Sequence, residues 1–136
     1  MSRPTYSVLL LEDDDPLRGV LNDLLVQWGC RVYATSFGQD AIQMAQKVQF
    51  DFSLLDMHLP GMSGYEVLRF LQTEIVPLPS IMMSGAASSL ETRRAIELGA
   101  FTFLRKPLDL EDLRSTMDQL IEFHFGRRPD QGPPQA

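Results

Sequence analysis

Acidic side chains gather where two short apolar segments of the chain end. Glu12 and Asp13 follow the segment Tyr6–Leu11, and Asp56 follows the segment Asp51–Leu55. Carboxylates that lie close together repel one another and raise each other's pKa unless a cation lies among them. Mg²⁺ prefers oxygen ligands and binds through one or two carboxylates, waters and a phosphoryl oxygen. If both segments end at one edge of a sheet, these acids predict a Mg²⁺ site, with Asp56 as the nucleophile of a phosphoryl transfer.

A hydroxyl and an ammonium group follow two further apolar segments. Ser84 comes directly after Ser80–Met83, and Lys106 lies just past Phe101–Leu104. In phosphoryl transfer, a lysine neutralises charge on the equatorial oxygens, and a hydroxyl can donate a hydrogen bond to one of them. The sequence therefore contains a nucleophile, an acid pair and a cation, provided that all four segments end at the same edge.

The elements that must position these side chains alternate strictly along the chain. Short apolar segments predict five strands, at 6–11, 31–35, 51–55, 80–83 and 101–104. Apolar residues at helical spacing predict helices at 17–28, 41–48, 65–71 and 110–121, and one more that starts at Ser88 or Ser89 and stops at Gly99. Such alternation predicts an α/β fold, with a parallel sheet covered by helices on both faces.

The helix boundaries also follow from individual residues. Asp14 or Asp15 is expected to cap the first helix, and Asp109 the last. Ile96 and Leu98 are expected on the inner face of the fourth helix.

Length and composition exclude or disfavour several classes of function. The chain has 136 residues, which suits one domain, and a formal net charge of −6, which disfavours direct binding of nucleic acid. Its single cysteine, Cys30, excludes an internal disulfide and a multi-cysteine zinc site. No apolar segment approaches membrane-spanning length, and the N-terminus lacks a long apolar secretion signal. We expect a cytoplasmic protein with no membrane contact.

Together, these motifs resemble the receiver domain of two-component response regulators over residues 5–124. The matching motifs are Leu-Leu-Glu-Asp-Asp-Asp-Pro at 10–16, Leu-Leu-Asp-Met-His-Leu-Pro-Gly-Met-Ser-Gly at 54–64, Met-Ser-Gly-Ala at 83–86 and Arg-Lys-Pro-Leu at 105–108. The resemblance implies a flavodoxin-like (βα)5 fold for residues 1–125, doubly wound, with five parallel strands in the order 2-1-3-4-5. The Pro- and Gly-rich residues 126–136 are expected to form a flexible tail, or a linker to an output domain outside this chain.

The resemblance also implies roles for the acidic residues. Asp56 takes the phosphoacceptor position. Glu12, Asp13 and Asp56 take the metal-binding positions, with the backbone carbonyl of His58 as a further ligand of Mg²⁺. The His58 side chain is expected at the surface, with some influence on the hydrolysis rate.

The remaining roles concern phosphate binding and switching. Lys106 takes the phosphate-binding position, and its bond to Pro107 is expected to be cis. Ser84 takes the switch hydroxyl position, and Phe103 the aromatic switch position.

What these roles imply is a signalling switch rather than a conventional enzyme. A sensor histidine kinase or a histidine phosphotransfer protein supplies the phosphoryl group, and the domain catalyses its own phosphorylation and slow dephosphorylation. The fourth helix, fifth strand and fifth helix then form the output surface, through which phosphorylation could drive homodimerisation. With an output domain attached, the protein would be a transcriptional regulator.

Two other functions belong to different classes. A Mg²⁺-dependent phosphatase with an aspartyl nucleophile usually carries a second aspartate two residues later, where this chain has His58. A flavin-binding module of the same topology would bring the flavin phosphate against Glu12 and Asp13, which argues against it.

Overall fold

Five short apolar segments form a single parallel sheet in the computed structural model, which describes residues 5–75, 77–126 and 133. Every neighbouring pair of strands is parallel, and their order is β2-β1-β3-β4-β5. The strands are β1 (Tyr6–Leu11), β2 (Cys30–Thr35), β3 (Phe52–Asp56), β4 (Ser80–Ser84) and β5 (Thr102–Arg105). The predicted α/β class and strand order are therefore confirmed.

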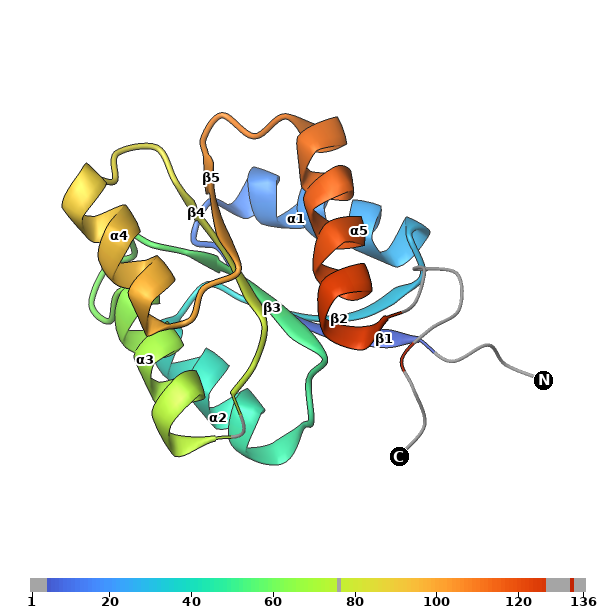
Figure 1. The fold of residues 1–136 in the computed structure, drawn as a ribbon, viewed down its shortest axis with the longest axis horizontal. Helices are drawn as coiled ribbons and strands as arrows, with labels where there is room; N and C mark the ends of the chain where they lie inside the picture. The colour runs from blue at the N-terminus through green and yellow to red at the C-terminus, as the bar shows by residue number, and fades with distance from the viewer. Residues whose placement is uncertain (1–4, 76, 127–132, 134–136) are drawn as a thin grey trace.

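Helices cover both faces of this sheet. They are α1 (Asp15–Gln27), α2 (Gly38–Lys47), α3 (Gly64–Glu74), α4 (Ser89–Leu98) and α5 (Leu110–Phe125). Helices α1 and α5 lie on one side of the sheet, and α2, α3 and α4 lie on the other (Figure 1). The fold is thus doubly wound, as predicted.

Four helices begin where a short polar side chain caps them, and in α3 the Ser63 hydroxyl accepts from the backbone N–H of Glu66. Of the two candidates for α1, Asp14 is the cap, and its side chain accepts from the backbone N–H of Leu17. Ser88 caps α4 and forms a capping box with Glu91. The side chain of Asp109 accepts from two backbone N–H groups at the start of α5. These bonds satisfy donors that the first turn of a helix leaves without partners.

The core consists of two apolar layers because successive strand residues point to opposite faces. In β1, Val8 and Leu10 pack with residues of α1 and α5, whereas Leu9 and Leu11 pack with residues of α2 and α3. These layers hold the strands in one register and thereby place their carboxyl ends together.

The prediction for the inner face of α4 was partly wrong. Ala95 is the buried residue of this helix, and the Ile96 side chain is 44% exposed. Because successive helical residues are turned by about 100°, Ile96 faces solvent when Ala95 faces the sheet. Leu98 is half-buried and packs against the core, as expected.

The chain segment beyond α5 lies mostly outside the described residues. Only Gly126 and Pro133 of the segment 126–136 are described, so its role as a tail or linker stays a prediction. Within the described residues, no helix has the length and apolar character needed to cross a membrane.

Candidate functional site

The carboxyl ends of the strands meet at one edge because all five run in the same direction. Leu11 pairs with Leu55, Asp56 with Met83 and Ser84 with Arg105 in the strand register. Residues that follow the strand ends therefore lie side by side. In an open parallel sheet, this edge is where ligands bind.

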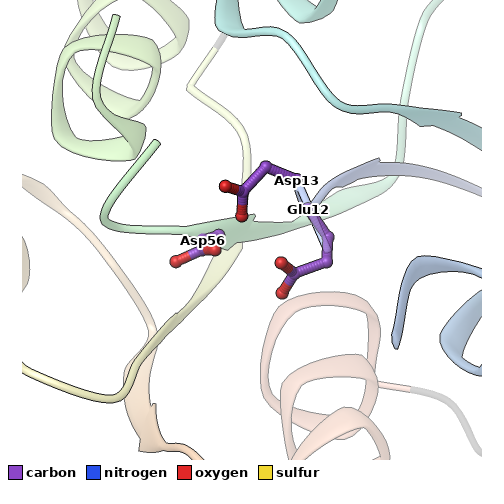
Figure 2. Close-up of side chains that lie close together, drawn as sticks. All are labelled: Glu12, Asp13 and Asp56. Atoms are coloured by element: carbon purple, nitrogen blue, oxygen red, sulfur yellow. The ribbon is translucent and has the colours of Figure 1, made fainter. Parts of the chain in front are cut away.

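Three carboxylates converge at this edge. Figure 2 shows Glu12 and Asp13, just past the end of β1, beside Asp56 at the end of β3. One oxygen from each of the three lies within 4.8 Å of the others, a spacing that could hold a metal ion. Glu12 is fully buried and Asp56 is 3% exposed, whereas Asp13 is exposed. The predicted acidic cluster thus forms in the folded chain.

Lys106 bridges the two buried carboxylates. Its Nζ lies 2.5 Å from Oε1 of Glu12 and 3.0 Å from Oδ2 of Asp56. The three carboxylates outnumber the one ammonium, so two negative charges at this edge stay uncompensated. A divalent cation would neutralise that remainder, and carboxylate oxygens are the donors that Mg²⁺ prefers. The donor set therefore fits Mg²⁺.

Burial and charge shift the proton affinities at this edge. Burial raises the pKa of the Glu12 carboxyl, and the nearby charge of Asp56 acts in the same direction, while bonds from Lys106 and the Asp14 N–H oppose them. Burial alone lowers the pKa of the Lys106 ammonium, but its hydrogen bonds to the Glu12 and Asp56 carboxylates, and their negative charges, outweigh burial and raise the pKa. Lys106 is therefore held in its charged form beside the nucleophile candidate.

Both oxygens of Asp56 are held in place. Oδ2 accepts from Lys106 Nζ at 3.0 Å, and Oδ1 accepts from the backbone N–H of His58 at 3.1 Å. The loop after β3 turns sharply to bring that N–H back toward the carboxylate. The turn ends at Gly64, where an added Cβ would lie 1.8 Å from the backbone oxygen of Asp56. Only glycine fits this close approach.

Ser84 lies at the same edge but bonds away from Asp56. Its Oγ lies 2.8 Å from Nδ1 of His58 and accepts from the backbone N–H of Ala86 at 3.1 Å. Nε2 of His58 lies 2.9 Å from Oε2 of Glu91. The His58 side chain lies at the surface, as expected, and is 45% exposed, but neither contact was predicted. No sequence signal indicates them, because they depend on how the loop after β3 folds.

Two further expectations concern the end of β5. The Lys106–Pro107 bond is cis, as expected. Phe103 is half-buried and packs against the core layer formed with α2, α3 and α4. Its role as a switch residue stays a prediction, as does the His58 carbonyl as a metal ligand.

A doubly wound parallel sheet with the strand order 2-1-3-4-5 defines a flavodoxin-like domain, and here its carboxyl edge carries an acidic site. Residues 8–118 match the family model described as the response regulator receiver domain. The chain therefore belongs to the response regulator receiver domains of two-component systems.

Curated relatives agree with this family. The cell cycle response regulator CtrA of Brucella ovis is 33% identical over 114 residues, which cover 84% of this chain and 49% of that protein. CtrA of Brucella abortus gives the same figures. The chain thus spans about half the length of the curated relatives it matches.

Solved structures share the fold. The chemotaxis protein CheY4 of Vibrio cholerae matches with a TM-score of 0.78 and 26% identity, over 85% of this chain and 98% of that one. The receiver domain of the sensor histidine kinase PA1611 from Pseudomonas aeruginosa, with magnesium coordinated in its active site cleft, matches with a TM-score of 0.76 over 86% and 98% of the two chains. At 24% identity, this second match bears on the fold alone.

Proposed function

We propose that this domain is a phosphorylation-activated switch in which Asp56 accepts a phosphoryl group from a phosphohistidine. The observation that carries the proposal is the charge arrangement at the sheet edge. Lys106 pairs with Glu12 and Asp56, and the three carboxylates still leave two negative charges uncompensated. This arrangement suits a divalent cation and a phosphoryl group, because the group's developing negative charge would lie beside the ammonium.

The residues of this chain perform the transfer as follows. Glu12, Asp13, Asp56 and the His58 carbonyl would hold Mg²⁺, which when bound supplies charge neutralisation for the phosphoryl oxygens. An oxygen of Asp56 attacks phosphorus, and the O–P bond forms as the P–N bond to the donor imidazole breaks. The imidazole leaves with the electron pair of that bond.

After transfer, Lys106 and Ser84 follow the new charge, and Phe103 follows Ser84. The ammonium of Lys106, which lies 3.0 Å from Asp56 Oδ2 before transfer, pairs with a phosphoryl oxygen. The Ser84 hydroxyl moves toward another, and Phe103 turns into the space beside it. Phosphorylation thereby shifts a two-state equilibrium that exists beforehand.

A protein donor is favoured by an apolar groove beside Lys106. The groove has a volume of about 380 Å³ and lies between α1, the loop after β5 and the start of α5, lined by Pro16, Leu17, Val20, Pro107, Leu108 and Leu110. Val20 and Leu110 are exposed apolar side chains within it. We propose that the groove receives the sensor histidine kinase or the histidine phosphotransfer protein, in the cytoplasm.

Apolar side chains also favour an output surface on α4, β5 and α5. Leu90 and Ile96 on α4 and Phe123 on α5 are exposed, with Phe123 at 76%. We propose that this face contacts an output domain or a second copy of the domain. An output domain that binds DNA would make the whole protein a transcriptional regulator. Sizing the protein with and without beryllofluoride and Mg²⁺ distinguishes the second copy, because only self-association increases the size.

The nucleophile is tested by labelling with acetyl phosphate and Mg²⁺. We expect Asp56→Asn to abolish labelling, because an amide does not attack phosphorus. Asp51→Asn is the matched control, since Asp51 lies just before the opposite end of the same strand, and it should be labelled like the unaltered protein. Full labelling of the Asp56→Asn variant would refute the assignment.

The phosphatase alternative differs in turnover. An aspartyl phosphatase would release phosphate from small esters over many cycles, whereas a switch accepts one phosphoryl group and releases it slowly. The His58 ring, which stands where such enzymes place their acid/base, is bonded to Ser84 and Glu91. These two hydrogen bonds of the ring favour a switch over a phosphatase.

A further inference from the structure

A chain of hydrogen bonds links Ser84 to the first turn of α4. Nδ1 of His58 lies 2.8 Å from Ser84 Oγ, and Nε2 of the same ring lies 2.9 Å from Oε2 of Glu91. The other carboxylate oxygen of Glu91 accepts from the Ser88 N–H at 3.1 Å, which completes the capping box of α4. We call His58, Ser84 and Glu91 the histidine latch.

The chemistry of the three groups decides where the protons lie. A carboxylate only accepts, so the His58 nitrogen that faces Glu91, Nε2, carries a proton. In a neutral ring, Nδ1 is then an acceptor, and the Ser84 hydroxyl donates to it. The Ala86 N–H donates to the oxygen of that hydroxyl at 3.1 Å, which uses its accepting side. Every polar group of the latch is thereby satisfied.

A hydroxyl has one proton, and the latch already uses it. A phosphoryl group on Asp56 carries only acceptor oxygens, so Ser84 can bond to it only by withdrawing its proton from His58. Ser84 lies next to the site, because it directly follows Met83, the residue that pairs with Asp56 between β3 and β4. Ser84 is 2% exposed, so water does not readily replace the lost bond.

We propose that His58 and Glu91 are positioning residues that hold the Ser84 hydroxyl in the unphosphorylated arrangement, so that phosphorylation must open the histidine latch and release the first turn of α4. This inference rests on the proposed function, because it concerns the hydroxyl that would follow the phosphoryl group. It adds a defined connection between the sheet edge and α4.

The surroundings leave room for the latch to open. A cavity of about 210 Å³ lies beside it, lined by Met57, His58, Ser63, Tyr65, Glu91 and Arg94. The side chains of His58 and Glu91 are 45% and 41% exposed. The ring can therefore turn without disturbing the core, and the bond it loses is partly replaced by water at the Glu91 end.

The substitution Glu91→Gln tests the latch without removing the helix cap. The capping-box bond from the Ser88 N–H requires an oxygen, so the glutamine amide nitrogen faces His58. That nitrogen donates to Nε2, which moves the ring proton to Nδ1 and frees the Ser84 proton. We expect the variant to bind beryllofluoride, in saturating Mg²⁺, about two- to tenfold more tightly, as measured by ¹⁹F NMR.

Two controls separate the latch from general effects. Glu97→Gln makes the same charge change on the exposed face of α4 and should bind beryllofluoride like the unaltered protein. In a Ser84→Ala background, Glu91→Gln should have no effect, because there is no hydroxyl proton to release. Equal beryllofluoride affinities of the Glu91→Gln and Glu97→Gln variants would overturn the proposal. So would an increase in affinity from Glu91→Gln that is just as large in the Ser84→Ala background.

The proton position can also be observed directly. ¹⁵N NMR of the ring should show the Nε2–H form in the unaltered protein and the Nδ1–H form in the Glu91→Gln variant, and the reverse order would overturn the latch. If the unaltered protein takes neither a phosphoryl group nor beryllofluoride, the proposed function fails and the switching role fails with it. If it takes both and Glu91→Gln changes neither affinity nor tautomer, only the latch fails.

Discussion

At the scale of single residues, the charge balance of the site depends on Lys106. Its ammonium is the group that bonds both Glu12 and Asp56. The Glu12 side chain is fully buried and that of Lys106 is 21% exposed, so water screens this pair only in part. Removing one partner of a buried pair leaves the other charge uncompensated, which costs more than the pair contributes.

Lys106→Met should therefore lower the stability of the fold and at the same time strengthen Mg²⁺ binding. Without Mg²⁺, we expect a loss of about 3 kcal/mol in the free energy of unfolding. Mg²⁺ should bind the variant more tightly, because the three carboxylates lose their competing cation, while labelling by acetyl phosphate falls. Urea unfolding and calorimetric titration measure the two effects, and weaker Mg²⁺ binding would contradict the charge argument.

Asp51 supplies a pH test away from the site. Burial raises the pKa of its carboxyl, although the Ser7 N–H, which donates to Oδ2 at 2.7 Å, opposes the shift. The folded protein therefore holds this proton more tightly than the unfolded chain. The stability that this carboxyl contributes is fully present below its pKa in the unfolded chain, about 3.9. It is lost as the pH rises through the pKa of the carboxyl in the folded protein.

Asp51→Asn keeps an acceptor oxygen for Ser7 and does not ionise. We expect the free energy of unfolding of this variant, relative to the unaltered protein, to increase as the pH rises above about 4 and then to level off. Denaturant unfolding at a series of pH values measures the difference. A difference that decreases over this range would show that the native fold favours the ionised carboxylate.

At the scale of elements, the loop from β3 to α3 orients the Asp56 carboxylate. It carries the His58 N–H that bonds Asp56, and it passes so close to the strand end that Gly64 lies against the Asp56 carbonyl. The Gly64 N–H donates to the Met57 carbonyl at 2.9 Å and holds the start of α3 there. Packing at this point therefore affects the geometry of the site directly.

Gly64→Ala should be severely destabilising. The added Cβ would meet backbone, which cannot move aside like a side chain, and we expect a loss of about 3 kcal/mol or more in the free energy of unfolding. Gly19→Ala is the control, because its Cβ would meet nothing within 4 Å in the helix α1. That change should stabilise by about 0.5–1 kcal/mol. Equal effects of the two substitutions, measured by thermal unfolding, would argue against the close approach.

The sequence predicted these elements where a local cause determines them. Asp14, Ser88 and Asp109 cap their helices because the bond lies within one turn, and Pro16 suits the first turn of α1. Ile96 was misplaced because helical spacing alone does not decide which neighbouring residue faces the sheet. The contacts of His58 were missed because Ser84 and Glu91 lie 26 and 33 residues away, on elements that only the folded sheet brings together.

At the scale of the whole molecule, the strict alternation of strands and helices was the main basis for predicting both the fold and the position of the site. It required a parallel sheet, and a parallel sheet required Glu12, Asp56, Ser84 and Lys106 to share one edge. The part beyond this domain follows from neither fold nor site. The chain spans about half the length of its curated relatives, so an output domain and its partners stay proposals.

The most direct test of the account is the effect of Mg²⁺ on equilibrium unfolding. A ligand that binds only the folded state raises the free energy of unfolding. Once the ligand concentration exceeds the dissociation constant, this increase grows with the logarithm of the concentration. We predict that the unfolding midpoint of the unaltered protein rises with Mg²⁺ in this way, and that Asp13→Asn flattens the rise. A midpoint that does not respond to Mg²⁺ would contradict the cation site, and with it the role of Asp56 as phosphoacceptor.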